Sequence, residues 1–394
     1  AGALLAYLIG SGTASGQESM QYFTSWGSVG GTLTVMVVNA VVMFCTFMAY
    51  TYAGRHGTSD LAGVCEFYCG KVVGKLFTAF AWIFNACCFF FMISGFGSTL
   101  NQQWDVPLWI GYLIAVALAV GTAVMGLQGI VNIIGKIGPV VVTFLFVLGV
   151  IAAFRFFPHI PDGIALIRSG QVELLQAGAT PVLAGLSFGG CSILLVAAYM
   201  ASLGKELIAY KKKYTIILCT IGALAITVTV GILGLCHLGN VEQSSTAPIP
   251  NLLIANDIFG AASSILGPVF AIIILLSIYS TFCPMLWTCV STIIKDEKSF
   301  QYKLTCILSG VGVFIVDLFI PYETLVNIIM TYCGYTGSVV FIVLTIRWIM
   351  VSRKDRLEKR IWPELPFSHQ YETIYTAGQR LRPQSTALKR WPHL

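Results

Sequence analysis

Polar and small residues interrupt the first apolar stretch of the chain. Residues 8–19, LIGSGTASGQES, contain three glycines, four hydroxyl residues, a glutamine and a glutamate. In lipid an unpaired backbone group is costly, so a helix breaks only where it lines a cavity or a binding site. Glycines ease such a break; the alternative is a kink, or small residues that allow tight helix packing. The stretch predicts a broken helix that binds a solute through Gly10, Ser11, Gly12, Thr13, Ser15 and Gln17.

A similar stretch follows five predicted spans later, at residues 183–195, LAGLSFGGCSILL. Transporters built from inverted repeats carry interrupted helices at corresponding positions of their two halves. We therefore expect a second broken helix here, with Phe188 closing over the solute. The expected solute contacts from this stretch are Ser187, Phe188, Gly189 and Cys191.

Hydroxyl residues share one helix face in the stretch LLSIYSTFCPMLW, residues 275–287. Ser277, Ser280 and Thr281 are spaced i, i+3 and i+4. Hydroxyl and carbonyl oxygens suit a hard cation, so these residues and the carbonyls of Ala6 and Ile9 form a predicted Na⁺ site. The alternative is that the hydroxyls bond back to their own helix.

Three further residues are expected to line the solute site. Asn85 and Phe89 share a face of the third predicted span, in the stretch FNACCFFFMISGFG, and Tyr279 lies in the eighth span. Small-molecule pockets are mostly apolar with a few placed polar groups, which such a mixture fits.

Two ionisable residues lie where membrane helices are expected. Lys136, in NIIGKIGPVVV, is a candidate coupling residue that loses a proton during transport, because an ionisable side chain inside a membrane is functional by default. The alternative is that Lys136 snorkels to the cytoplasmic interface. Glu18 begins the predicted second half-helix and is expected to cap its amides or to gate the site.

Composition excludes a water-soluble protein. Of the 394 residues, 57% are hydrophobic and 10% charged, and the mean hydropathy is +0.82, whereas soluble domains carry about 25% charged residues. Apolar runs of roughly 20 residues predict transmembrane helices rather than barrel strands. The twelve cysteines have neither metal spacing nor a disulfide pattern. We expect an all-α integral membrane protein without a cofactor other than a coupling ion.

The apolar runs predict ten spans and four regions. A first five-helix repeat covers 1–156, an extracellular loop 157–177, a second five-helix repeat 178–352 and a basic cytoplasmic tail 353–394. The spans are 1–26, 30–54, 76–99, 107–126, 130–156, 178–203, 214–237, 264–294, 302–321 and 323–351. All five histidines are expected to lie outside the apolar spans.

Lysine and arginine predict the orientation. Of 23 such residues, only Arg155 and Arg168 fall in loops expected outside. This positive-inside pattern predicts a multi-pass protein of the plasma (cytoplasmic) membrane with both termini in the cytoplasm. The net charge of +6 then reflects topology, and we expect membrane lipid and a small solute, not nucleic acid, as partners.

The chain resembles the YkvI-like membrane proteins in three motifs: GSGTASGQESMQYF, GLSFGGCSILLVAAYMASLGKE and YCGYTGSVVF. That family looks like a branch of the amino acid–polyamine–organocation (APC) superfamily. The resemblance implies the LeuT fold, a 5+5 inverted repeat with helices 1 and 6 broken. It implies a solute site at mid-membrane between helices one, three, six and eight. Where the family is expected to carry tyrosine and asparagine, this chain has Phe188 and Cys191, so the solute is not carried over.

These patterns favour a cation-coupled secondary transporter of a small zwitterionic or carboxylated solute, such as an amino acid, working by alternating access. Na⁺ and H⁺ both stay open as the coupling ion. The alternative is a membrane receptor or sensor that keeps the transporter fold without transport. An enzyme is not expected, since the spans lack paired aspartates and His–Glu or Ser–His arrangements. No GxxxxGK[ST] motif of a primary pump occurs.

Overall fold

The computed structural model describes residues 11–58, 60–124, 127–209, 212–294 and 296–357, and every regular element in these ranges is a helix. The described residues up to Trp348 belong to one compact unit, and the described residues from Ile349 to Leu357 to a second. Among the predicted site residues, Ala6, Ile9 and Gly10 lie outside the described ranges. The division into two five-helix repeats stays a prediction.

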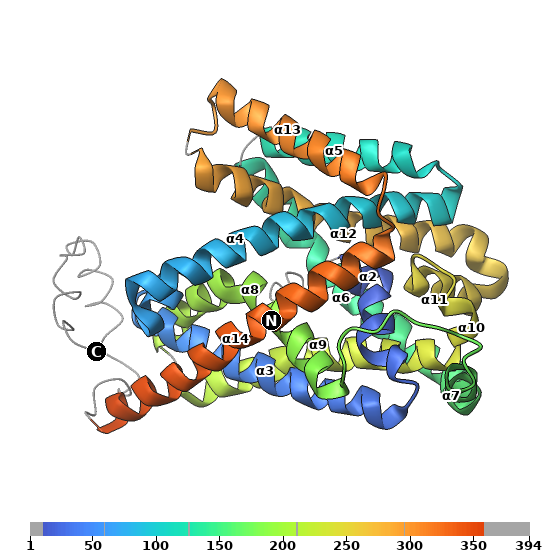
Figure 1. Cartoon of the computed structure of the whole chain (residues 1–394), viewed down its shortest axis with the longest axis horizontal. Helices are drawn as coiled ribbons and strands as arrows, with labels where there is room; N and C mark the ends of the chain where they lie inside the picture. The colour runs from blue at the N-terminus through green and yellow to red at the C-terminus, as the bar shows by residue number, and fades with distance from the viewer. Residues whose placement is uncertain (1–10, 59, 125–126, 210–211, 295, 358–394) are drawn as a thin grey trace. The chain divides into compact units, whose positions relative to one another are not determined.

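Most helices follow one another with short connections, whereas residues 169–180 form a long loop between the end of α7 at Arg168 and the start of α8 at Pro181 (Figure 1). Their bounds are α2 Ser11–Ser15, the π-helical turn η1 Ser19–Phe23, the 3₁₀ turn η2 Thr24–Trp26, α3 Val29–Arg55, α4 Leu61–Trp104, α5 Leu108–Val124, α6 Leu127–Phe156, η3 Phe157–His159, α7 Ile160–Arg168, α8 Pro181–Glu206, η4 Leu207–Ala209, α9 Lys212–Gly239, α10 Val241–Ser244, α11 Pro250–Phe259, η5 Gly260–Ala262, α12 Ser263–Ile293, α13 Phe300–Asp317 and α14 Tyr322–Leu357.

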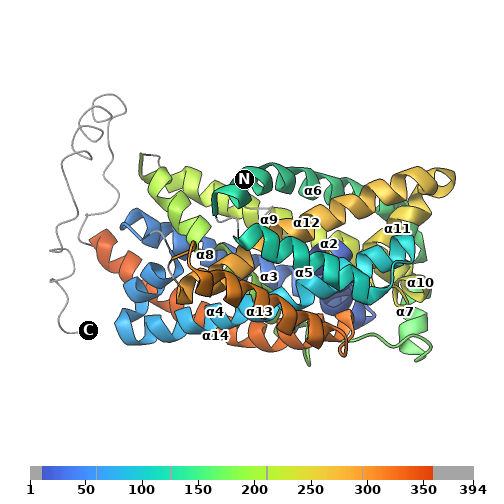
Figure 2. The ribbon, with the colours of Figure 1, turned by 90° about the horizontal axis from the view of Figure 1, so that it is seen from above.

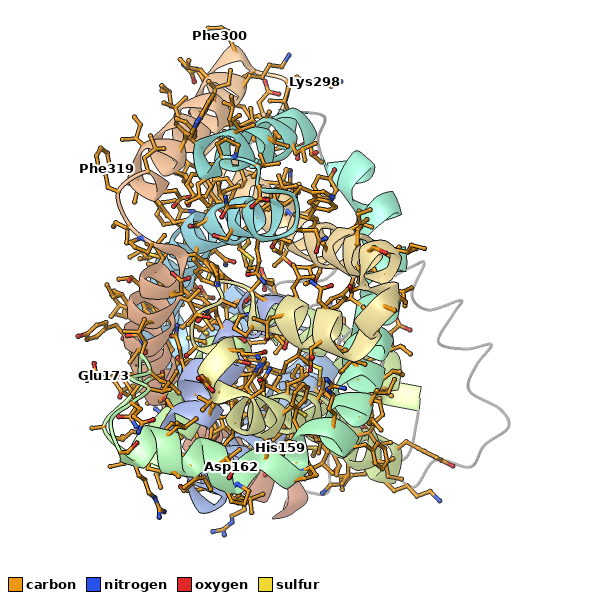
Figure 3. The ribbon with its side chains drawn as sticks, turned by 90° about the vertical axis from the view of Figure 1, so that its right-hand side faces the viewer. His159, Asp162, Glu173, Lys298, Phe300 and Phe319 are labelled. Carbon is orange, nitrogen blue, oxygen red and sulfur yellow. The ribbon has the colours of Figure 1, made fainter. Side chains whose placement is uncertain are left out.

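Within the described ranges, seven helical segments are long and apolar enough to cross a membrane, and Leu108–Val124 and Pro181–Leu194 are shorter apolar helices. Large apolar side chains point outward; Phe300 and Phe319, near the ends of α13, point away from the ribbon in Figure 3 and are 77% and 79% exposed. Such surfaces suit lipid and not water. The chain is therefore a multi-pass integral membrane protein, and the count of ten spans stays a prediction.

The first predicted helix is broken, as expected. α2 ends at Ser15, and Gly16 takes a positive φ of +95° before helical turns resume. Glycine reaches this left-handed region at low cost because it has no Cβ. α2 packs against α4, α11 and α12, and η1 packs against α3, α8 and α9. Figures 1 and 2 show α2 surrounded by other helices in both views.

The second predicted break is wrong. α8 runs without interruption from Pro181 to Glu206, through Gly189 and Gly190. Its glycines serve close helix packing instead. A Cβ at Gly190 would overlap the Gly334 carbonyl oxygen of α14, and one at Gly185 would lie 3.0 Å from the Val35 carbonyl oxygen of α3. Small residues here bring three helices together and leave the backbone of α8 helical.

Replacing Gly190 by alanine is expected to destabilise the protein. The added methyl group must push α8 away from the Gly334 carbonyl, and overpacking of this kind costs about 1–3 kcal/mol. Gly121→Ala in α5 is the control, because nothing lies within 4 Å of its Cβ position. The midpoint of thermal unfolding in detergent should fall for Gly190→Ala and not for Gly121→Ala. Equal midpoints would mean that α8 and α14 are not in close contact.

Candidate functional site

The break places four polar residues of the first helix in the interior. Thr13, Ser15, Gln17 and Glu18 are all buried. Because Gly16 turns the chain, the Gln17 amide donates to the Ser15 hydroxyl (3.2 Å) and not to the Thr13 carbonyl four residues earlier. The carbonyls before Gly16 are therefore open to partners from elsewhere in the fold.

Asn251, the second residue of α11, supplies that partner. Its amide nitrogen donates to the carbonyls of Thr13 and Ala14, both at 3.0 Å. Since carbonyls only accept, this fixes the orientation of the amide and turns Asn251 Oδ1 toward His237 Nε2, 3.0 Å away. His237 Nδ1 lies 3.1 Å from Ser244 Oγ. Nε2 must donate to the amide oxygen, so the neutral ring accepts the Ser244 hydroxyl at Nδ1.

The Glu18 carboxylate folds back over α2. Its Oε2 accepts a hydrogen bond from the Thr13 hydroxyl, and its Oε1 occupies the space where a side chain at Gly12 would begin. Glu18 makes no side-chain capping bond to the turn that follows. The expectation that Glu18 caps free amides is therefore wrong, because the carboxylate points to Thr13 instead.

Amide side chains tie the first helix to the loop before α11 and to α14. Gln17 Nε2 donates to the carbonyls of Ala247 (3.3 Å) and Pro248 (3.1 Å). Gln21 Nε2 donates to Gln17 Oε1 (3.2 Å) and to the Glu323 carbonyl (3.0 Å). These direct bonds close the side of the break that faces the α10–α11 segment.

α8 borders the break through Phe188, which is buried against Tyr22 and Phe23 of η1, with ring centroids 5.2 and 5.4 Å apart. Ser187 Oγ lies 3.3 Å from the Tyr22 hydroxyl and donates to the Thr331 carbonyl of α14 at 3.1 Å. Phe188 therefore packs against the π-helical turn that follows the break of the first helix. Its expected position at a break of its own helix is wrong, because α8 is continuous.

The two other α8 candidates make contacts with neighbouring helices. Cys191 donates to the Met330 carbonyl of α14 at 2.9 Å. A Cβ at Gly189 would lie 2.8 Å from Val42 Cβ of α3. Gly189 thus serves the contact with α3 and does not open toward the break.

Two of the α12 hydroxyls predicted as Na⁺ ligands bond back to their own helix. Ser280 and Thr281 donate to the Ser277 carbonyl of their own helix at 2.7 and 3.0 Å. α12 as a whole packs against α2. Within the described ranges, no group of three or more His, Cys, Asp or Glu residues is placed to hold a metal ion.

The remaining candidates pack between helices. Asn85 donates to the Ala81 carbonyl of its own helix at 3.1 Å, and Phe89 stacks edge-on against Phe282 at 6.5 Å. The Tyr279 hydroxyl lies 2.9 Å from Thr122 Oγ1 of α5, away from the break. Ser11 begins α2 and Lys136 lies in α6, and the side chains of both are outside the described part of the structure.

Three residues at the break escaped the sequence analysis. Tyr22 follows the glycine-rich stretch, where only its closeness to the break could have marked it. His237 is fully buried within α9, which corrects the expectation that every histidine lies outside the apolar spans. Asn251 follows two prolines in a polar loop, and nothing local indicates that it reaches the first helix.

Comparisons with known proteins agree with this architecture. No family model matches the chain. It is 26% identical over 204 residues to the uncharacterised protein YyaD of Bacillus subtilis (strain 168), a match that covers 52% of the chain and 55% of YyaD. The chain thus spans about half the length of this curated relative.

Solved transporter structures share the fold at low identity. MhsT in complex with L-phenylalanine matches with a TM-score of 0.57 at 13% identity, over 90% of this chain and 96% of MhsT. The Eremococcus coleocola manganese transporter gives 0.53 at 14%, over 96% and 84%. The inward-facing conformation of Mhp1 gives 0.52 at 16%, over 89% and 76%. The chain is an all-α, multi-pass membrane protein whose fold is similar to that of these three transporters.

Proposed function

We propose that the chain is a cation-coupled secondary transporter of a small zwitterionic or carboxylated solute, such as an amino acid, that works by alternating access. The break of the first helix at Gly16, inside a bundle with a transporter fold, is the observation that carries this proposal. Membrane helices are interrupted where backbone groups line a substrate path. The buried hydroxyls and amides of Thr13, Ser15 and Gln17 are the polar groups of that path.

The solute site would lie beside the break, with Phe188 and Tyr22 as its apolar wall. In the present conformation the bonds from Gln17 to Ala247 and Pro248 close one side. Alternating access requires these bonds to part when that side opens, and an equivalent closure to form on the other. Gly12 and Thr13 would then meet the solute through backbone and hydroxyl groups.

The coupling ion in this proposal is Na⁺ or H⁺. A sodium site would use Ser277, Ser280 and Thr281 of α12 with the carbonyls of Ala6 and Ile9. Proton coupling would use Lys136 or Glu18. Membership of the YkvI-like family, with solute and ion sites near mid-membrane and cytoplasmic termini, belongs to the same proposal and rests on the sequence motifs.

Reconstituted protein tests the proposal. A thermal-shift screen of amino acids, amines and carboxylates, with and without Na⁺, identifies ligands, because a compound that binds the folded state raises its stability. Counterflow uptake of each ligand into liposomes then follows, with Na⁺ and pH gradients applied separately. We expect one gradient to drive accumulation. Binding without flux would identify a receptor instead, and a lack of response to both gradients would refute coupling.

A further inference from the structure

Glu18 is a carboxyl group deep in the helix bundle. Its side chain is 5% exposed, and the Thr13 hydroxyl donates to its Oε2. Its Oε1 packs against the backbone at Gly12, where any larger residue would displace it. Among the described residues, no lysine or arginine forms an ion pair with it; the resolved Arg–carboxylate pair joins Arg155 to Asp257.

Among the side chains that the structure describes, the titratable groups that face Glu18 supply no positive charge. They are Tyr22 of η1, Cys88 of α4 and Cys191 of α8. From the side of α9 and α11 the neighbouring groups are His237 and Asn251, which bond to each other, and His237 is satisfied by neutral partners on both ring nitrogens. Glu18 thus lies among hydroxyl, thiol and amide groups.

An ionised carboxylate in such surroundings is costly. Transfer of an unpaired charge out of water is unfavourable by several kcal/mol even after the protein relaxes, and intramembrane carboxyls mark ion and proton pathways. A bound proton removes the charge and needs no additional space. The protonated carboxyl can still accept the Thr13 hydrogen bond at its carbonyl oxygen.

We infer, on the basis of the proposed transport function, that Glu18 carries the coupling proton and is protonated in the closed break of this structure. When the site opens to the side of higher proton concentration, the carboxylate takes a proton from hydronium and releases water. The protonated form closes with the solute. On the other side, hydration of the opened site returns the proton to water as hydronium, so that one proton crosses per cycle.

Infrared spectroscopy of the purified protein tests the protonation state without any transport. At neutral pH, wild type should show a carboxylic-acid C=O band that Glu18→Gln lacks. Glu242→Gln, an exposed glutamate of α10, is the matched control and should leave the band unchanged. The buried Asp317 remains in every variant, so the difference isolates Glu18. Spectra of wild type and Glu18→Gln that are identical in the carboxylic-acid C=O region would show an ionised Glu18 and overturn the inference.

A second variant keeps this test decisive if Glu18→Gln does not fold. Thr13→Val removes the hydroxyl donor but keeps the carboxyl. Because the C=O frequency depends on hydrogen bonding, the same band should shift in Thr13→Val. A carboxylate band that shifts instead, with no change in the acid region, would contradict a protonated Glu18.

Liposome uptake tests the coupling role with a solute that wild type accumulates. At one proton per solute, a gradient of about one pH unit supports about tenfold accumulation. That ratio should fall to about one in Glu18→Gln and persist in Glu242→Gln. Accumulation that follows a Na⁺ gradient and ignores pH would overturn the inference while leaving transport intact. If wild type moves no solute, the proposed function and the coupling role fail together, and the infrared comparison alone reports whether Glu18 is protonated.

Discussion

Gly16→Ala is expected to lower the midpoint of thermal unfolding by roughly 5 °C or more and to abolish solute uptake. At φ +95° an alanine carries backbone strain of about 1–2 kcal/mol. Its Cβ would also lie 2.8 Å from Asn251 Oδ1 and 2.9 Å from the Asn251 backbone nitrogen, which adds overpacking of about 1–3 kcal/mol. At a few degrees per kcal/mol, the sum gives the expected shift.

The chain offers a matched control for Gly16. Gly57 has φ +98°, nearly the same as Gly16, but nothing lies within 4 Å of its Cβ position. Gly57→Ala therefore measures the backbone strain alone. The extra loss of stability in Gly16→Ala measures the approach of Asn251. Equal shifts for the two variants would show that Asn251 does not pack against the break.

The first break could be predicted from sequence because its signal is local. Glycines occur beside hydroxyls, an amide and a carboxylate within a single apolar run, a combination that favours an interrupted helix in lipid. The membrane class followed from composition for a similar reason, since the balance of apolar and charged residues is a property of the whole chain. Neither inference depends on which helices are in contact.

The second break failed because glycines that break a helix and glycines that pack one look alike in sequence. Gly185 and Gly190 leave room for the close approach of the backbones of α3 and α14, which are more than a hundred residues away along the chain. Ser187 and Cys191 likewise bond to carbonyls of α14. A polar residue beside a glycine therefore indicates a break only when no helix approaches closely.

The partners of the break were beyond prediction for the same reason. Asn251 donates to the Thr13 carbonyl, and the Tyr322 hydroxyl lies 2.9 Å from Ser15 Oγ. Each contact joins residues more than 200 positions apart, and a single sequence carries no trace of such contacts. Helix spacing did place Ser280 and Thr281 on one face. It could not tell whether their hydroxyls turn toward an ion or toward the Ser277 carbonyl.

Asn251→Leu is expected to destabilise the closed break more than any other single side-chain truncation there. Leucine keeps the branched shape of asparagine, although it is larger, and leaves the carbonyls of Thr13 and Ala14 and the Nε2–H of His237 without partners. Each buried group that loses its partner costs about 1–3 kcal/mol. We expect a loss of about 3 kcal/mol or more in the free energy of unfolding, measured by denaturation in detergent.

Asp257→Asn is the control within the same helix. Asp257 of α11 pairs with Arg155 at 2.8 Å, with both side chains substantially exposed, and exposed pairs contribute about 0–1 kcal/mol. The stability of Asp257→Asn should therefore stay close to that of wild type. A loss as large as that of Asn251→Leu would point to α11 as a generally fragile helix and not to the bonds of Asn251.

A double-mutant cycle with His237→Phe measures how much the bond between His237 and Asn251 contributes to the free energy of unfolding. Asn251→Leu and His237→Phe each break the bond between Nε2 and Oδ1, so the pair should cost less than the sum of the two single changes, by about 1–2 kcal/mol. The carbonyls of Thr13 and Ala14 lose their donor only through Asn251→Leu, which should keep that variant the more damaging. Strict additivity of the two losses of unfolding free energy would show that His237 and Asn251 do not interact. The measured coupling tells whether α9 holds the broken helix closed through the Asn251 amide.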